Sequence, residues 1–292
     1  LQAGTLTALE QRRIGFPWSP GLVERSRRST GATVAAVEAS LHQGLGVNLA
    51  GGTHHAFADH GQGFCVFNDA AVAIRVWQQR GAIRRAMVVD CDVHQGNGTA
   101  AIFAADATVF TFSMHGARNF PFAKCDGDLD SALPNGTRDE NYLACLQDAR
   151  DHRISFDAAD IAFCLAGADP YEHDRLGKLN LTMRGLVERD QTVFAALTGL
   201  LYVERCVGMR RITLTIVGVD EEAISAFFIG SRDFDLGGAG CADDAFNQLR
   251  NRFRITANFF GATFTAHFPA VFNRVLIVVD DRHLGIVALT SP

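Results

Sequence analysis

Acidic residues and a histidine follow one apolar run at alternate positions. Asp90, Asp92 and His94 stand two residues apart after the run MVV at 87–89. Residues two apart on an extended backbone share a face, so these three side chains are predicted to point together. Clustered carboxylates repel one another and are costly to bury, and a divalent cation removes both costs. Asp169 follows another apolar run, so Asp92, His94 and Asp169 are predicted to form a three-ligand site with open positions, as catalytic zinc requires.

These residues also have a structural interpretation. Aspartates that follow strands often cap helices, and a nearby histidine is often only hydrogen-bonded. That interpretation is favoured for any one of the residues taken alone. Three such residues at the ends of two strands favour a metal site.

Two adjacent histidines, His54 and His55, lie in a segment rich in glycine. Adjacent side chains are expected to diverge, so we expect no single zinc ion to bind both. Each could instead donate or accept a proton if a partner fixed its tautomer. Asn97 lies between two glycines, which let the backbone come close to the predicted strand that ends at Asp90. Taken alone, the histidines would indicate a surface pair and Asn97 a turn.

Apolar strand-like runs alternate with helical segments in the first two thirds of the chain. Helices are predicted within 21–45, within 64–81 and at 181–197, a loop at 46–64, and strands at the run before Asp90, at 107–115 and at 160–169. This alternation predicts an α/β fold with a mostly parallel sheet that is buried on both faces. Ligand sites in such sheets lie at the carboxyl ends of the strands, where the polar clusters stand.

The composition is that of a packed globular protein. The chain has 292 residues, 48% of them hydrophobic, and a formal net charge of −5. This charge argues against a general nucleic-acid or anionic-membrane binder. The chain contains no apolar run of about 20 residues and opens on no leader-like segment. Its seven cysteines include no CxxC pair, which predicts reduced thiols in a cytoplasmic protein and argues against a zinc ribbon.

Four segments in order resemble consecutive signatures of the histone deacetylase family. They are GGTHHAFADHGQGFCVFNDAAVA, VVDCDVHQGNGTA, TFSMHGARNFPF and LAGADPYEHDRLGKLNLT. The resemblance is strongest to the bacterial histone deacetylase-like branch, which includes acetoin-utilisation-type zinc deacetylases, and it covers residues 1–196. It implies a three-layer arginase/deacetylase α/β fold and zinc-dependent hydrolysis of an N-acetylated amine such as acetyl-lysine.

The resemblance also implies roles for the clustered residues. The positions that match the family's zinc ligands are Asp92, His94 and Asp169. The positions that match its tandem catalytic histidines and their orienting partners are His54 with Asp90, and His55 with Asn97. Zinc would polarise the acetyl carbonyl and lower the pKa of its water to about 7. His55 would take the proton from that water, and one histidine of the pair would protonate the leaving amine.

Further positions match the family's substrate tunnel and its inner cation site. Gly63 and Phe64 resemble one wall of an acyl-lysine tunnel, and Phe120 resembles the facing aromatic wall. Ser113, with Asp90, Asp92 and His94, matches an inner monovalent-cation site, which implies K⁺. Asp174 matches a second acidic position near the metal loop.

The C-terminal part departs from the family pattern. Deacetylases of this family place a Gly-rich loop with Tyr or His opposite the two histidines, where the side chain bonds the oxyanion. The Gly-rich segment 236–241 has neither residue beside it, and Tyr202 does not fit the pattern. Loss of one oxyanion donor costs about 100- to 1,000-fold in turnover. We therefore predict a core at 1–196 and an unmatched region at 197–292, in a fold incomplete at both ends and a gene product that is partial or frame-disrupted.

Three functions remain open from the sequence. The first is a zinc deacetylase acting on an acetylated lysine peptide or an acetylated small amine. The second is an impaired relative that binds zinc and acyl-lysine without efficient turnover. The third, a binuclear manganese ureohydrolase, is disfavoured because Gly96 stands where a further carboxylate is needed. The oligomeric state is left open.

Overall fold

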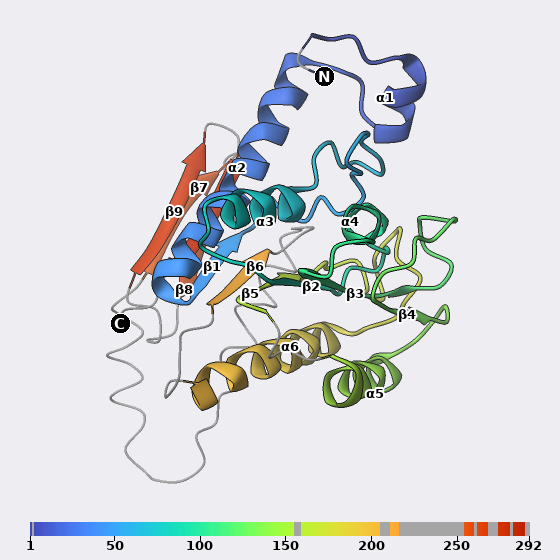
Figure 1. Cartoon of the computed structure of the whole chain (residues 1–292), viewed down its shortest axis with the longest axis vertical. Helices are drawn as coiled ribbons and strands as arrows, with labels where there is room; N and C mark the ends of the chain where they lie inside the picture. The colour runs from blue at the N-terminus through green and yellow to red at the C-terminus, as the bar shows by residue number, and fades with distance from the viewer. Residues whose placement is uncertain are drawn as a thin grey trace.

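The computed structural model describes residues 1, 3–154, 159–204, 211–215, 254–259, 262–267, 274–280 and 283–289. Its centre is a six-stranded sheet in the order β1-β6-β5-β2-β3-β4 (Figure 1). Its strands are β1 (Leu45–Asn48), β2 (Ala86–Asp90), β3 (Val109–Gly116), β4 (Leu129–Leu133), β5 (Ile161–Leu165) and β6 (Arg211–Thr215). Each neighbouring pair in this sheet is parallel, which confirms the predicted α/β class.

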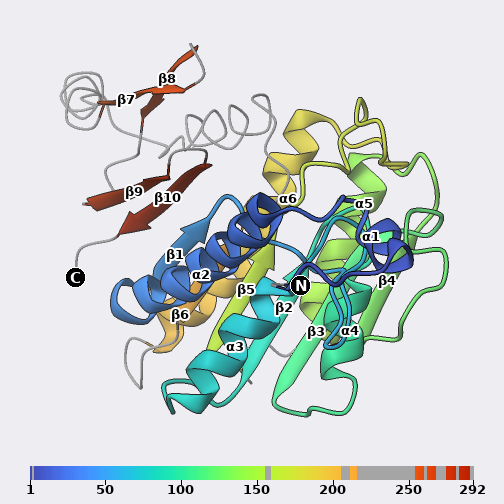
Figure 2. The same ribbon diagram turned by 90° about the horizontal axis from the view of Figure 1, so that it is seen from above.

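Helices cover both faces of the sheet. They are α1 (Ala8–Ile14), α2 (Pro20–Gln43), α3 (Asp69–Gln79), α4 (Asn97–Phe103), α5 (Asp139–Asp148) with its π-helical extension η1 (Ala149–Arg153), and α6 (Met183–Glu204). In Figure 1, α2 and α3 lie on one side of the sheet and α5 and α6 on the other. Figure 2 shows α2 running over β1 and β6, with α3 next to it. The fold therefore has the three predicted layers.

Side chains that alternate along the central strands fill two separate cores. On β2, Met87 and Val89 face the cluster that contains residues of α5 and α6. Ala86 and Val88 face the cluster that contains residues of α2, α3 and α4. Because both faces are apolar, the strand is one continuous hydrophobic run, as expected for a parallel sheet covered on both sides.

Residue types at the helix ends explain where the first two helices begin and end. Thr7 and Glu10 form a capping box at the start of α1. Ser19 caps α2, whose first residue is Pro20, and Gly44 ends that helix with a φ of 87°. A proline at the first helical position and a glycine after the last one are the expected signals.

Several elements differ from the sequence prediction. The predicted loop at 46–64 begins inside β1, a four-residue edge strand whose Gly46 weakens its pattern. The sequence did not identify α1, β4, α4 or α5. The strand β6 lies beyond residue 196 and pairs with both β1 and β5, so the described sheet extends past the predicted core.

Four further strands form two antiparallel pairs in the C-terminal region. One pair is β7 (Arg254–Phe259) with β8 (Ala262–His267), and the other is β9 (Arg274–Asp280) with β10 (His283–Leu289). The division of the chain at residue 196 stays a prediction. In the described part of the chain, no helix has the length and apolar character needed to cross a membrane.

Candidate metal centre and histidine pair

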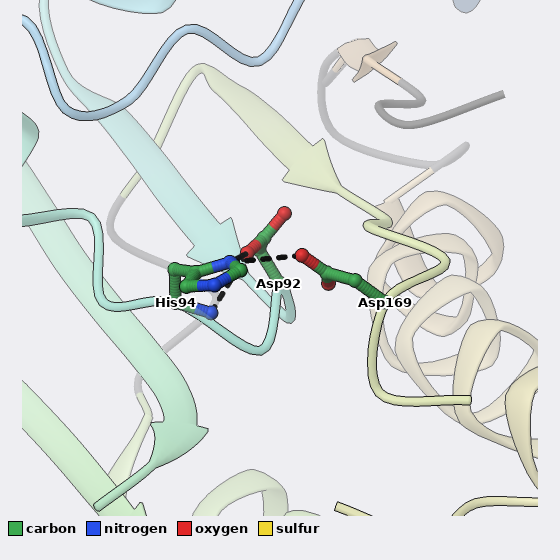
Figure 3. Close-up of side chains that lie close together, drawn as sticks. All are labelled: Asp92, His94 and Asp169. Atoms are coloured by element: carbon green, nitrogen blue, oxygen red, sulfur yellow. Dashed lines mark hydrogen bonds and ion pairs between the residues drawn. The ribbon is translucent and has the colours of Figure 1, made fainter. Parts of the chain in front are cut away.

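Three side chains from two loops converge beside the carboxyl ends of β2 and β5. The ligand atoms that Asp92, His94 and Asp169 could offer lie within 4.8 Å of one another. Nδ1 of His94 is 3.0 Å from Oδ1 of Asp92 and 2.9 Å from Oδ2 of Asp169 (Figure 3). The structure thus brings together the three residues predicted as metal ligands.

Backbone contacts hold the two loops against each other. The N–H of Cys91 donates to the carbonyl of Leu165 and so extends the β2–β5 ladder by one bond. The N–H of Val93 donates to Oδ1 of Asp169 at 2.9 Å. A Cβ on Gly167 would collide with the side chain of Asp92, so a glycine is needed for this close approach. The separation of the carboxylates is therefore set by backbone as well as by side chains.

The electrostatics of this cluster fit a bound cation. Burial, and then the neighbouring Asp92 carboxylate, raise the pKa of Asp169 to about 6. Burial opposes ionisation of Asp92, but His54 and His94 hold its pKa well below the usual range. Two carboxylates and one imidazole that share a point are a donor set that a divalent ion such as zinc accepts. The group could hold such an ion.

Asp90 departs from the sequence argument that placed it with Asp92 and His94. The strand β2 ends at Asp90 and the chain bends after it, so the alternation of an extended backbone does not continue. Oδ2 of Asp90 instead lies 2.6 Å from Nδ1 of His54. This pairing is the one implied by the family resemblance.

The adjacent histidines do not diverge, contrary to the expectation from the sequence. The ring centroids of His54 and His55 are 4.1 Å apart, and both side chains are buried. Nδ1 of His55 lies 2.8 Å from Oδ1 of Asn97. Nε2 of His54 lies 3.9 Å from Oδ1 of Asp92, and the His55 ring is 5.9 Å from the His94 ring. Both rings therefore stand beside the candidate metal centre.

The two histidines differ in protonation because their partners differ. Burial lowers the pKa of His54, but the carboxylates of Asp90 and Asp92 outweigh burial and raise the pKa to about 9. Burial, and then the charge of His54, lower the pKa of His55 to about 2. At neutral pH one ring is cationic and the other is neutral, so the pair has both a proton donor and a proton acceptor.

Comparisons with known proteins identify the family to which the chain belongs. The pattern of the histone deacetylase domain matches residues 4–203, more than half of the chain. This chain belongs to the histone deacetylase family. The family resemblance predicted from the four motifs is thus confirmed.

Relatives of this family member include both uncharacterized and named proteins. An uncharacterized protein of Picosynechococcus sp. is 48% identical over 204 residues, covering 70% of this chain and 68% of that protein. Histone deacetylase 2 of Arabidopsis thaliana is 30% identical over 189 residues, covering 64% of this chain and 47% of that protein. A solved HDAC homolog complexed with SAHA has a TM-score of 0.61 and 25% identity, covering 74% of this chain and 58% of that one. This family member spans about half to two thirds of the length of these proteins.

Two of the three predicted wall residues lie directly against the histidine pair. The ring of Phe120 packs edge-on to the His55 ring at 4.9 Å. Gly63 has a φ of 55°, and a Cβ there would stand 2.8 Å from both His55 and Phe120. Phe64 is 58% exposed and packs on Phe16 at 5.1 Å. Phe120 and Gly63 therefore border the histidine side of the site, whereas the exposed ring of Phe64, the residue after Gly63, packs on Phe16.

The predicted cation residue Ser113 lies on β3 opposite Asp90 on β2. Its hydroxyl is 3.0 Å from Nδ1 of His115, and both side chains are buried. Asp174 lies outside the cluster of three, and its Oδ1 accepts the N–H groups of Leu176 and Gly177. Ser113 is therefore next to the Asp90 end of the site, while Asp174 shapes its own loop.

The sequence missed three residues that support the site. Asp69, at the start of α3, accepts hydrogen bonds from the backbone of Gly52 and Thr53, just before His54. Oε1 of Gln62 accepts from the Asn97 amide and so fixes which Asn97 atom faces His55. Arg189 is buried and donates to carbonyls in the two loops that carry the candidate metal ligands. Asp69 stands in the quoted family motif, whereas a lone arginine in an amphipathic helix carries no signal of its own.

The sequence predicted that no tyrosine stands opposite the two histidines. The three tyrosines of the chain, Tyr142, Tyr171 and Tyr202, lie in different parts of it. Tyr142 is fully buried in the core on the α5 and α6 side of the sheet. Tyr171 packs against His173 at 5.2 Å. Tyr202 is part of α6, and the Gly-rich segment 236–241 lies outside the described residues.

Proposed function

We propose that the chain contains the core of a zinc-dependent deacetylase that hydrolyses an N-acetylated amine such as acetyl-lysine. One observation carries the proposal. His54 and His55 are each fixed through Nδ1, one by a carboxylate and the other by an amide oxygen, and both stand beside a cluster of two aspartates and one histidine. Hydrolysis of an amide needs a proton acceptor for water and a proton donor for the leaving amine. His55 would supply the proton acceptor and His54 the proton donor.

Asp92, His94 and Asp169 would hold the ion. Bound zinc polarises a carbonyl and lowers the pKa of water to about 7. Neutral His55 would accept the proton of the attacking water at Nε2, because its Nδ1 faces Asn97. His54, held in the cationic form by its bond to Asp90, would donate its Nε2 proton to the departing amine and become neutral. Each histidine would thus act through Nε2.

The substrate would reach the histidines along the aromatic side of the site. Gly63 and Phe64 would form one wall, and Phe120 the facing wall, for a narrow aliphatic stem such as that of acetyl-lysine. The solved HDAC homolog complexed with SAHA supports SAHA as a probe for this site. An acetylated small amine would present the same stem. Ser113, beside Asp90, would contribute to a K⁺ site.

The test is amine release from a fluorogenic acetyl-lysine peptide, with zinc added and His55→Ala as the control. We expect zinc-dependent turnover that falls about 100- to 10,000-fold in the variant. Parallel assays with an acetylated polyamine would show which amine is preferred. Turnover that is the same in wild type and His55→Ala would contradict the proposal.

A second candidate is a relative that binds zinc and acyl-lysine but turns over slowly. It is favoured by the positions of Tyr142, buried in the core, and Tyr171, which packs on His173. Zinc-dependent binding of SAHA without measurable amine release would support this candidate over the enzyme.

A further inference from the structure

A fully buried arginine lies under the loops that carry the candidate metal ligands. Arg189, on α6, is 2% exposed and is the largest fully buried side chain in the described part of the chain. Arginine is almost never buried to this extent without partners, because the charge must be compensated. The partners of Arg189 therefore indicate what its burial achieves.

The guanidinium joins two segments that are far apart in the sequence. Its Nη1 donates to the carbonyl of Gly167 at 2.7 Å and to the carbonyl of Cys91 at 3.1 Å. Its Nε donates to Oδ1 of Asp190 at 2.8 Å, which compensates the charge. The planar group presents its donors in a fixed geometry, so the two carbonyls are held at a defined separation.

Both carbonyls belong to residues next to candidate ligands. Cys91 directly precedes Asp92, and Gly167 is two residues before Asp169. The β2–β5 ladder ends with the bond from Cys91 N–H to the Leu165 carbonyl, and the two carbonyls lie at or beyond this end. The guanidinium thus bridges the chains where their sheet pairing stops.

The bridge adds to direct contacts between the loops, among them the pairing of Nδ1 of His94 with Oδ2 of Asp169. Another is the bond from Val93 N–H to Oδ1 of Asp169. That bond uses a carboxylate of the site, whereas Arg189 acts on the backbone. Removing the guanidinium would leave two buried carbonyls without this donor and would free the loops to separate.

We propose that Arg189 is a positioning residue that sets the separation of Asp92 and Asp169 and so tunes the affinity of the site for a divalent metal. The inference rests on the proposed function in one respect, which is that the three-residue cluster binds a metal. A purely structural role in anchoring α6 would affect stability but not metal affinity in the folded protein.

The test compares Arg189→Lys and Arg189→Met with Val193→Ala. Val193 is buried four residues further along the same helix and belongs to the core cluster, so its truncation loosens α6 packing while the hydrogen bonds of Arg189 to the loops are kept. The zinc dissociation constant is measured by competition with a chromophoric chelator, alongside thermal melts and the absorption spectrum of the Co²⁺-loaded protein. We expect zinc affinity to fall about 10- to 100-fold in both Arg189 variants, as for other residues that support ligands. We expect Val193→Ala to lower the melting temperature and leave zinc affinity within about twofold of wild type.

Arg189→Lys keeps the charge and loses the planar fork, so it carries the test if Arg189→Met does not fold. A folded Arg189→Lys with wild-type zinc affinity and an unchanged Co²⁺ spectrum would overturn the inference. Equal loss of affinity in Val193→Ala would overturn it too, because it would reduce the effect to general loosening. Wild-type protein that binds no zinc would refute the proposed function together with this inference, whereas the first two outcomes would leave the proposed function standing.

Discussion

Burial lowers the pKa of both adjacent histidines, but at His54 the carboxylates of Asp90 and Asp92 outweigh burial and raise the pKa. Asp90 makes His54 a stronger base, whereas Asn97 offers His55 no compensating charge. In the proposed mechanism, the assignment of acid and base would thus depend on the partners of the two imidazoles. Residues that hold Asp90 or Asn97 in place should therefore change the turnover rate without touching a substrate.

Asn97→Ala is expected to lower kcat about 100-fold, since His55 would lose the group that fixes its tautomer. Steady-state kinetics on the acetyl-lysine peptide would measure this effect. Gln62→Ala, which removes only the support of Asn97, should have a smaller effect. A larger loss in Gln62→Ala than in Asn97→Ala would contradict this ordering.

His115 should make the stability of the fold depend on pH. Burial lowers the pKa of His115 to about 4, against 6.5 as its ordinary value. Above pH 6.5 the residue is neutral in both states, and as the pH falls toward 4 only the unfolded chain takes up the proton. The free energy of unfolding should therefore fall by about 2 kcal/mol from this residue between pH 7 and pH 5.

Urea unfolding at these two pH values, in wild type and His115→Asn, would isolate that contribution. The variant should lose about 2 kcal/mol less than wild type over the same interval. Equal losses in the two proteins would show that His115 is not the group responsible.

At the scale of elements, the site is built from loops. The first turn of α3 holds the histidine loop in place, and the ends of β2 and β5 hold the loops that carry the candidate metal ligands. Asp69 opens α3 and accepts from the backbone of Gly52 and Thr53 and from the hydroxyls of Thr33 and Thr53. One buried carboxylate therefore ties α2, α3 and the histidine loop together.

Asp69→Asn is expected to destabilise the fold by about 2–3 kcal/mol, because its amide group would face donors. Chemical denaturation would measure this loss. Asp59→Asn is the matched control, since the side chain of Asp59 is 84% exposed and should change stability by less than about 0.5 kcal/mol. Equal effects of the two substitutions would refute the role given to Asp69.

Gly63→Ala tests the close packing of the loop that carries Phe64. A methyl group there would meet both His55 and Phe120, whereas one at Gly81 would meet nothing within 4 Å. Both glycines have positive φ, so both substitutions should cost about 1–2 kcal/mol in backbone strain. SAHA binding measured by calorimetry should weaken in Gly63→Ala and stay unchanged in Gly81→Ala. Equal SAHA affinities in the two variants would contradict the predicted wall.

At the scale of the whole molecule, the sequence predicted the parallel sheet, its layers and the three-residue cluster. Those predictions succeeded because buried strands such as β2 are apolar on both faces and end in polar residues. It missed β1, which has four residues, and β4, whose run LDSAL is interrupted by Asp130 and Ser131. The extended backbone assumed for residues 90–94 ends at Asp90, whereas the pairing of Asp90 with His54 that the resemblance implied is present. Asp69 stands in the quoted family motif but its partners lie far away in the sequence, and Arg189 carries no signal because it binds the carbonyls of distant residues.

Metal removal should lower the stability of the folded chain. Zinc at 100 times its dissociation constant should stabilise the protein by about 2.7 kcal/mol relative to the chelated form. Thermal melts with zinc or with chelator would show the difference. Asp169→Asn should show almost no zinc-dependent shift, and a full shift in that variant would place the binding site elsewhere.

The bond from Val93 to Asp169 joins residues 76 positions apart, and it has a consequence for folding kinetics. The two loops can meet only after β2 and β5 have paired, which requires closing a long stretch of chain. Zinc would then find a complete set of ligands only late in folding. We expect added zinc to slow unfolding while leaving the refolding rate nearly unchanged. The ion would thus stabilise the sheet after it has formed and would not speed its assembly.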